Sequence, residues 1–192
     1  IAAISQQRAA KASSEGLFDS EMLPIAGVNV DQGIRLGTTS ETLSALKPAF
    51  SPEGVVTAGN ASQISDGSAA LLVMTSERAK ELGLHPIVRV HTNVMAGVDP
   101  VIMLTGPIPA TEKILAKSGL SLGDIGVFEV NEAFASVLGA WLKDTGADHE
   151  ITNPNGGAIA LGHPLGASGA RIMTTLVHHM QRNNIMYGLQ TM

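Results

Sequence analysis

The feature that most constrains the fold is a regular alternation of strand-like and helix-like segments in residues 68–192. Short apolar runs predict strands, and longer stretches opened by Ser or Pro and closed by Gly predict helices. The predicted strands are 69–75, 87–93, 126–130, 158–161 and 186–191, and the predicted helices are 76–82, 109–118, 132–143 and 167–181. This alternation favours an α/β fold in which helices cover a sheet.

The first part of the chain is less regular, so we expect two units, residues 1–64 and 65–192. The first unit holds a predicted helix at 1–14, a strand at 22–30 and a short helix at 40–46. The chain opens without Met inside a helix and stops inside an apolar stretch. We therefore expect it to be cut from a longer protein.

Composition narrows the function classes. With 44% hydrophobic and 15% charged residues, the sequence is typical of a globular protein and not of a disordered one. A net charge of −5 and no basic stripe disfavour a nucleic-acid partner. No apolar run approaches the roughly 20 residues of a membrane span, and no signal peptide is visible. We expect no membrane partner and a cytoplasmic location, with an organelle as the alternative.

The sequence contains no cysteine. Disulfides and cysteine-based zinc sites are therefore excluded, and no metal site is expected.

Asn131 is the first candidate functional residue. It follows the apolar strand 127–130 and opens a predicted helix. Asn is among the best helix N-caps, which gives one interpretation. The carboxyl end of a strand is also where ligands of α/β proteins lie, and an amide there can hold a water or stabilise an oxyanion. Glu132 could favour the first helical turn through the helix dipole.

His163 is the second candidate, because it lies in a segment crowded with glycines that permit tight turns. The segment matches neither a P-loop nor a Gly-x-Ser-x-Gly nucleophile elbow. A neutral imidazole can take a proton from a thiol or hydrogen-bond a carbonyl. The remaining histidines have no such context and are interpreted as structural or solvent-facing: His85, His91, His149, His178 and His179.

Four segments, in order, resemble the thiolases, which make or break carbon–carbon bonds between acyl groups on coenzyme A. They are Lys47–Phe50 with Thr57–Ser62 and Asp66–Gly67, Gly106–Pro109, Asn131–Phe134, and Gly162–Gly166. The resemblance implies a layered α-β-α-β-α sandwich. Residues 1–64 would form the end of the loop domain that covers coenzyme A, and residues 65–192 the C-terminal core domain, short of its last segment. Known members are dimers or tetramers.

The resemblance also assigns roles. Asn131 would hold a catalytic water that, with His163, forms an oxyanion hole, and His163 would help to activate a cysteine. Ser62 would contact the pantetheine arm and Arg35 the nucleotide end, while Met103 and Phe134 would line the acyl pocket. The full set for coenzyme A and substrate is Arg35, Phe50, Ala58, Ser62, Met103, Ala133 and Phe134. The resemblance further implies coenzyme A and acyl-CoA as substrates, and no tightly bound cofactor is expected.

Taken singly, several of these residues have ordinary structural interpretations: Phe50 as core, Ser62 as a turn residue, and Arg35 with Lys47 as a solvated face.

The missing cysteine leaves two main functional hypotheses. The first is a thiolase whose cysteines lie outside these residues, with Cys expected directly after Met192 and no activity from the 192 residues alone. The alternative is a non-catalytic thiolase-like protein that binds coenzyme A or lipid. A condensing enzyme acting on acyl-carrier protein ranks last, because such enzymes lack the Asn-Glu-Ala-Phe pattern.

Overall fold

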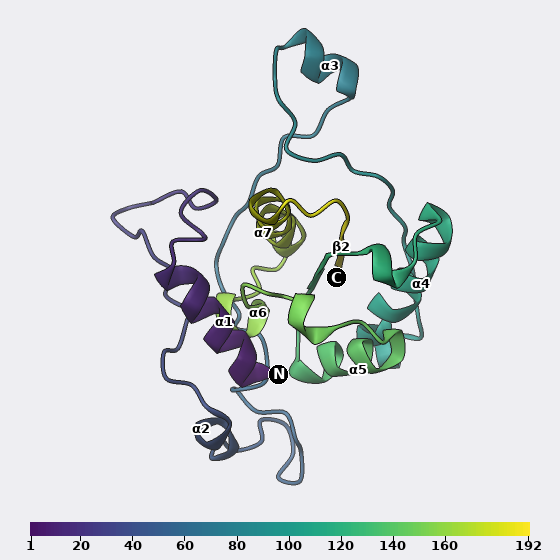
Figure 1. Ribbon diagram of the computed structural model, residues 1–192. Helices are drawn as coiled ribbons and strands as arrows, with labels where there is room; N and C mark the ends of the chain where they lie inside the picture. The colour runs from purple at the N-terminus through teal and green to yellow at the C-terminus, as the bar shows by residue number, and fades with distance from the viewer.

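The computed structural model describes all 192 residues. Figure 1 shows the course of the chain. Its regular elements are α1 (Ala2–Ser14), α2 (Ser40–Ser44), α3 (Ser76–Glu81), η1 (Pro100–Thr105), α4 (Pro107–Ser118), η2 (Leu122–Asp124), β1 (Val127–Val130), α5 (Ala135–Thr145), η3 (His149–Ile151), α6 (Ala158–Leu161), α7 (Ser168–Asn183) and β2 (Gly188–Thr191). None of the helices has the combined length and apolarity that spanning a bilayer demands.

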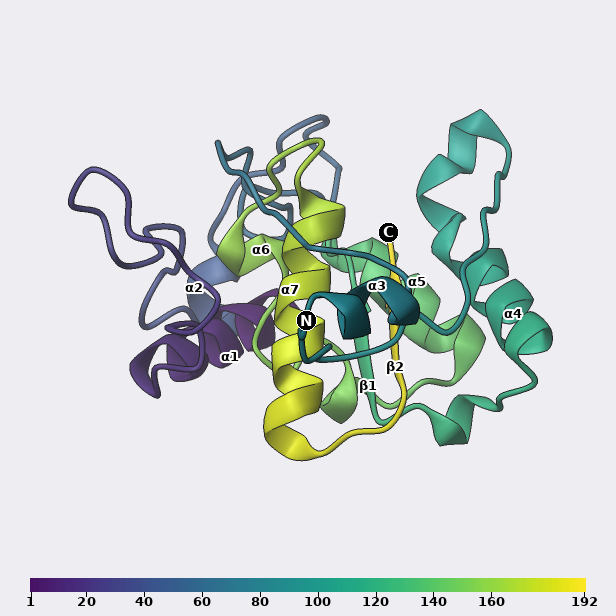
Figure 2. The same cartoon turned by 90° about the horizontal axis from the view of Figure 1, so that it is seen from above.

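A parallel pair of strands, β1 and β2, lies at the centre. Val127 is opposite Gly188, and Val130 is opposite Thr191. Thr152 adds a single parallel bridge to Phe128 on the other side of β1. Figure 2 shows α7 on one side of the strands and α5 with α4 on the other. Helices therefore cover both faces of a parallel sheet, as the predicted α/β alternation requires.

The main hydrophobic core lies between the strands and α5. Phe128 and Trp141 are almost fully buried and meet edge to face, with ring centroids 5.3 Å apart. The Trp141 indole N–H donates a 2.8 Å hydrogen bond to the Thr111 hydroxyl on α4. Trp141 thus joins α4, α5 and β1 through both apolar contact and a satisfied polar group.

Four predicted strands are wrong. Residues 22–30 contain only an isolated bridge between Ile25 and Val28, and residues 69–75 and 87–93 form no strand. Leu72 is 80% exposed. Apolar runs have strand propensity, but a strand forms only where a neighbour offers hydrogen bonds and a covered face. Residues 158–161, also predicted as a strand, form the short helix α6.

The predicted helices are confirmed, with shifted boundaries. Thr39 caps α2 and Thr75 caps α3, each through its side-chain hydroxyl. The most consequential shift is at α5, which begins at Ala135 instead of residue 132. Asn131 and Glu132 therefore precede the helix.

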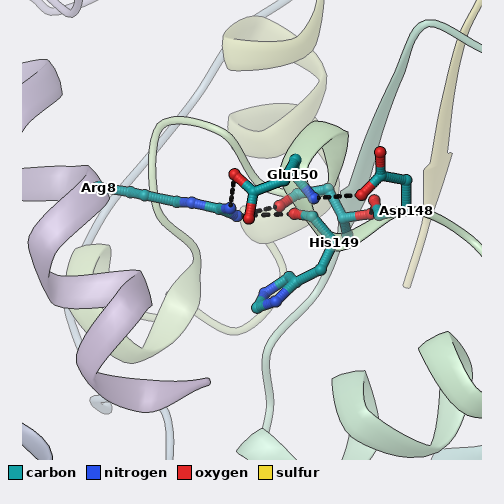
Figure 3. Close-up of polar contacts among 5 residues, drawn as sticks. Arg8, Asp148, His149 and Glu150 are labelled. Carbon is teal, nitrogen blue, oxygen red and sulfur yellow. Dashed lines mark hydrogen bonds and ion pairs between the residues drawn. The ribbon is translucent and has the colours of Figure 1, made fainter.

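Helix α1 packs directly on the C-terminal part of the chain, beside α6 (Figure 1). Figure 3 shows Arg8 reaching from α1 to η3. Its guanidinium donates to the carbonyls of His149 at 2.9 Å and Thr152 at 2.8 Å, and it pairs with Glu150 at 3.3 Å. Residues 1–14 are thereby fixed against the segment that leads to His163.

We predict that Trp141→Ala destabilises the fold by about 3–5 kcal/mol, because it empties a fully buried site and leaves Phe128 without its partner. Trp141→Phe keeps a ring but loses the hydrogen bond to Thr111, so a smaller loss of about 1–2 kcal/mol is expected. Urea-induced unfolding followed by circular dichroism measures both. Equal stability of the alanine variant and the parent would contradict this account of the core.

Candidate functional site

One large cavity, of about 910 Å³, opens between α4, β2 and the C-terminal half of α7. Asn131 and His163, the two candidates from the sequence, both line it. Met103 and Ala133 line the same cavity. Asn131 and His163 are 32 positions apart in the sequence, one after β1 and one after α6, and both reach this cavity.

Asn131 is only 8% exposed, and its backbone N–H donates to the carbonyl of Thr191 at 3.1 Å. Its side-chain Oδ1 is buried and has no hydrogen-bond partner within the chain. The N-cap of α5 is Phe134, so the helix-cap interpretation of Asn131 is wrong. A buried amide oxygen that lines a cavity without a protein partner is suited to accept a hydrogen bond from a water or a ligand.

The His163 backbone is fixed by its neighbours. Gly162, immediately before it, has φ +86°, and a Cβ there would overlap the side chain of Ser65. This turn therefore requires glycine. The N–H of His163 donates to the carbonyl of Gln63 at 2.8 Å.

The His163 ring has one clear partner. Its Nδ1 lies 2.5 Å from the Ser168 hydroxyl, which itself donates to the carbonyl of Pro164 at 3.0 Å. A Ser168 hydroxyl that donates its single proton to Pro164 accepts from His163, which places the ring proton on Nδ1. Nε2 is then left with a lone pair that can accept a proton.

Burial lowers the pKa of His163, and the nearby Arg171 cation lowers it further. Both effects disfavour the charged ring. The imidazole is therefore neutral near pH 7, the form that can act as a base.

Segment 60–65 joins the two candidate residues. The Ser62 N–H donates to the carbonyl of Ala133 at 2.9 Å, and the Asn60 carbonyl accepts from Ala135 at 2.8 Å. Gln63 holds His163, as described above. Ser62 therefore lies between the Asn131 loop and the His163 loop, although its side chain lines neither cavity.

The other expected site residues are placed differently. Arg35 and Ala58 line a separate cavity of about 100 Å³ beside Gln63. Phe50 is 81% exposed next to a turn closed by the Pro48–Thr57 bridge, so its interpretation as core is wrong. Phe134 caps α5 and lines neither cavity. The structure thus gathers Met103, Asn131, Ala133 and His163 and leaves Arg35, Ala58 and Phe50 apart.

Sequence reasoning missed Ser168 and Gln63. The mismatch of this segment with the Gly-x-Ser-x-Gly elbow excludes Ser168 as such a nucleophile, but its hydroxyl, five residues after His163, contacts the ring across a tight turn. The side-chain amide of Gln63 donates to the carbonyls of Gly33, Ile159 and Ala160 at 2.8, 3.1 and 3.0 Å. No sequence pattern predicts such long-range contacts. The structure contains no group of three or more His, Asp or Glu side chains arranged to hold a metal ion.

We predict that Arg171→Gln raises the pKa of His163, because the substitution removes a cation that disfavours the imidazolium. Arg182→Gln is the matched control. Arg182 lowers the pKa of His178 and His179 but not that of His163. NMR titration of the histidine ring protons measures the pKa values of His163, His178 and His179. A His163 pKa that is unchanged in Arg171→Gln would contradict the electrostatic assignment.

Comparison with known proteins finds thiolase sequences along nearly the whole chain. The profile of the thiolase N-terminal domain matches residues 1–77, and that of the thiolase C-terminal domain matches residues 84–192. A 3-ketoacyl-CoA thiolase of Escherichia fergusonii is 50% identical, over 100% of this chain and 53% of the relative. An acetyl-CoA acetyltransferase of Paracoccus denitrificans is 49% identical, over 100% of this chain and 51% of the relative.

Solved thiolase structures have the same fold as this chain. The Bacillus anthracis acetyl-CoA acetyltransferase superposes with a TM-score of 0.95 at 43% identity, over 99% of this chain and 50% of that one. Human mitochondrial 3-ketoacyl-CoA thiolase in complex with CoA gives 0.91 at 40% identity, over 98% and 49%. The chain spans about half the length of the curated relatives it matches. It has the thiolase-like α/β fold and belongs to the thiolase family.

Proposed function

We propose that the protein carrying this chain is a thiolase, an acyl-CoA acyltransferase that condenses acyl-CoA or cleaves 3-ketoacyl-CoA through a cysteine acyl-enzyme. The observation that carries the proposal is the shared cavity, in which Asn131 has a free amide oxygen and His163 has a ring nitrogen able to accept a proton. The cysteine thiolates come from residues outside the 192 described here.

His163 has two tasks in this proposal. Its neutral Nε2 takes the proton of the nucleophilic thiol, which generates the thiolate that attacks the thioester or ketone carbon. The same nitrogen, once protonated, donates a hydrogen bond to the oxygen on which negative charge develops. The Ser168 contact keeps Nδ1 protonated throughout, so that Nε2 is always the reacting nitrogen.

Asn131 supplies the second part of the oxyanion hole through a water. The buried Oδ1 can accept one hydrogen of a water in the cavity. The water's other hydrogen then points to the thioester oxygen, so that two donors converge on it.

Coenzyme A is the proposed carrier of the acyl group, supported by the similar human thiolase solved in complex with CoA. Met103, Ala133 and Phe134 are assigned to the acyl and pantetheine end, and Ser62 to the pantetheine arm. Arg35, Phe50 and Ala58 are assigned to the rest of the coenzyme A site, towards the nucleotide. The assembly is a homodimer or homotetramer, and no tightly bound cofactor is required.

We predict that His163→Ala in the complete protein lowers kcat for acetoacetyl-CoA thiolysis by at least about 100- to 1000-fold, since it removes a base and an oxyanion donor together. His178→Ala, on α7, is the control and should keep parental turnover. A folded His163→Ala variant within about tenfold of the parent would overturn the assignment. If the unaltered complete protein binds CoA but shows no turnover, the non-catalytic alternative holds.

We predict that Ser62→Ala raises KM for acyl-CoA more than it lowers kcat, because a pantetheine contact is made in ground and transition states alike. Ser62 is held through its backbone N–H, which donates to the Ala133 carbonyl and is unaffected by the substitution, so we expect the variant to fold. Ser44→Ala on α2, whose hydroxyl bonds only the Glu41 carbonyl, is the control. Steady-state kinetics over a range of acyl-CoA concentrations separates the two constants. Unchanged constants would place Ser62 outside the site.

A further inference from the structure

Glu132 is a buried carboxylate that the proposed chemistry does not use. It follows Asn131 at the end of β1 and is only 2% exposed. Successive residues of an extended chain point to opposite sides. Asn131 lines the large cavity, whereas Glu132 faces α1 and the segment 153–162 instead.

Three donors from separate parts of the chain converge on this carboxylate. The Ser5 hydroxyl on α1 donates at 2.6 Å, the Asn153 amide at 3.0 Å and the Ile159 backbone N–H at 3.4 Å. The last two belong to the segment that leads to His163. Glu132 therefore ties α1 and this segment to the residue next to Asn131.

Two of these donors are themselves fixed. The Ser5 oxygen accepts from the Gly157 N–H at 3.0 Å. Asn153 pairs with the backbone of Val130 on β1, where its Oδ1 accepts and its Nδ2 donates, both at 2.8 Å. The Ser5 hydroxyl hydrogen and one Asn153 amide hydrogen point to Glu132, and the other amide hydrogen points to Val130. Both residues therefore act as donors to Glu132.

Three donors face the carboxyl group, a pattern that favours its ionised form. Burial raises the pKa of Glu132, whereas the hydrogen bonds from Ser5, Asn153 and Ile159 and the Arg171 cation oppose that rise. No basic side chain lies within ion-pair distance, so backbone and side-chain dipoles hold the charge. Moving a donor away would leave the buried charge unsatisfied, which is costly, so the donors are held firmly in place.

Steric fit at the same point leaves little freedom. A Cβ on Gly157 would overlap the carboxyl group of Glu132, so glycine is required there. Gly156 is equally close to α1, since its Cβ would lie 2.7 Å from the carbonyl oxygen of Ser5. Segment 156–162 is therefore held by close backbone contact as well as by hydrogen bonds.

We propose that Glu132 is a positioning residue: its carboxylate fixes segment 153–163 against the end of β1 and so sets the separation between the Asn131 amide and the His163 ring. Its effect on turnover rests on the proposed thiolase function, but its effect on the segment does not. Small displacements of an oxyanion hole are costly, because a misplacement of about 1 Å can lower a rate about 100-fold.

The first test is Glu132→Gln in the complete protein. Gln has the same shape, but its NH2 group must face either the Ser5 hydroxyl or the Asn153 amide, both of which are donors. We expect kcat for thiolysis to fall about 10- to 100-fold with KM within about twofold. A folded variant with kcat within twofold of the parent would overturn the proposal.

Glu129→Gln is the matched control. Glu129 lies on β1, is 1% exposed and has a carboxylate oxygen without a hydrogen-bond partner. Burial raises its pKa to about 8, so Gln replaces a largely neutral group. We expect parental kcat. Equal losses in both variants would mean that any buried carboxyl change at β1 lowers activity, and would contradict a specific role for Glu132.

Ser5→Ala provides a second variant that leaves the Glu132 side chain itself unchanged. It removes one donor and frees the Gly157 N–H, so we expect a smaller loss of the same kind, about 3- to 10-fold in kcat. Parental kcat in a Ser5→Ala variant whose segment 156–163 exchanges faster would contradict the proposal.

A double variant separates positioning from general stability. If Glu132 acts through His163, adding Glu132→Gln to His163→Ala should change kcat by less than about twofold. A merely structural role would instead multiply the two losses. That outcome would refute the proposal.

Hydrogen exchange measured by mass spectrometry distinguishes failure of this proposal from failure of the proposed function. Glu132→Gln should speed exchange of segment 156–163 and leave α4 unchanged, whether or not the protein is a thiolase. Unchanged exchange would refute the positioning role. Faster exchange in a protein whose His163→Ala variant keeps its activity would refute only the catalytic assignment of His163.

Discussion

A single buried carboxylate, that of Glu132, receives hydrogen bonds from helix α1, from Asn153 and from the backbone of Ile159. Each donor is more than 20 residues from Glu132 along the chain. The carboxylate therefore connects segments that are distant in sequence. Arg8 strengthens the same junction by capping the carbonyls of η3 (Figure 3). The end of β1 and the turn before His163 are consequently parts of one rigid assembly.

Segment 60–65 is the second tie between the two halves of the candidate site. It pairs with Ala133 and Ala135 on one side and with His163 on the other. Gln63 extends this tie to α6 and to Gly33. Rigid elements on both sides suit a site in which two hydrogen-bonding groups must converge on one substrate oxygen. The Ser168 contact then sets which nitrogen of His163 is free to react.

The sequence predicted the parts of the fold that depend on local pattern. The strand predicted at 126–130 and the helices predicted at 109–118 and 167–181 follow from apolar runs and from Gly and Pro signals, and they correspond to β1, α4 and α7. Asn131 and His163 were singled out by their places at a strand end and in a glycine-rich segment, and by the resemblance to thiolases. Residues 69–75 and 87–93 have the same apolar pattern, but no strand in these 192 residues pairs with them. Glu132 was interpreted through the helix dipole, because local reasoning cannot see donors such as Ser5. The exposure of Phe50 was likewise a tertiary outcome.

We infer that His163 and a water held by Asn131 together bind one thioester oxygen in the shared cavity. A crystal structure of the complete protein with a bound acyl-CoA tests it most directly. We expect the thioester oxygen about 2.7–3.1 Å from His163 Nε2 and from a water held by Asn131 Oδ1, with Nδ1 still in contact with Ser168. A thioester oxygen bound elsewhere, out of reach of both groups, would contradict it.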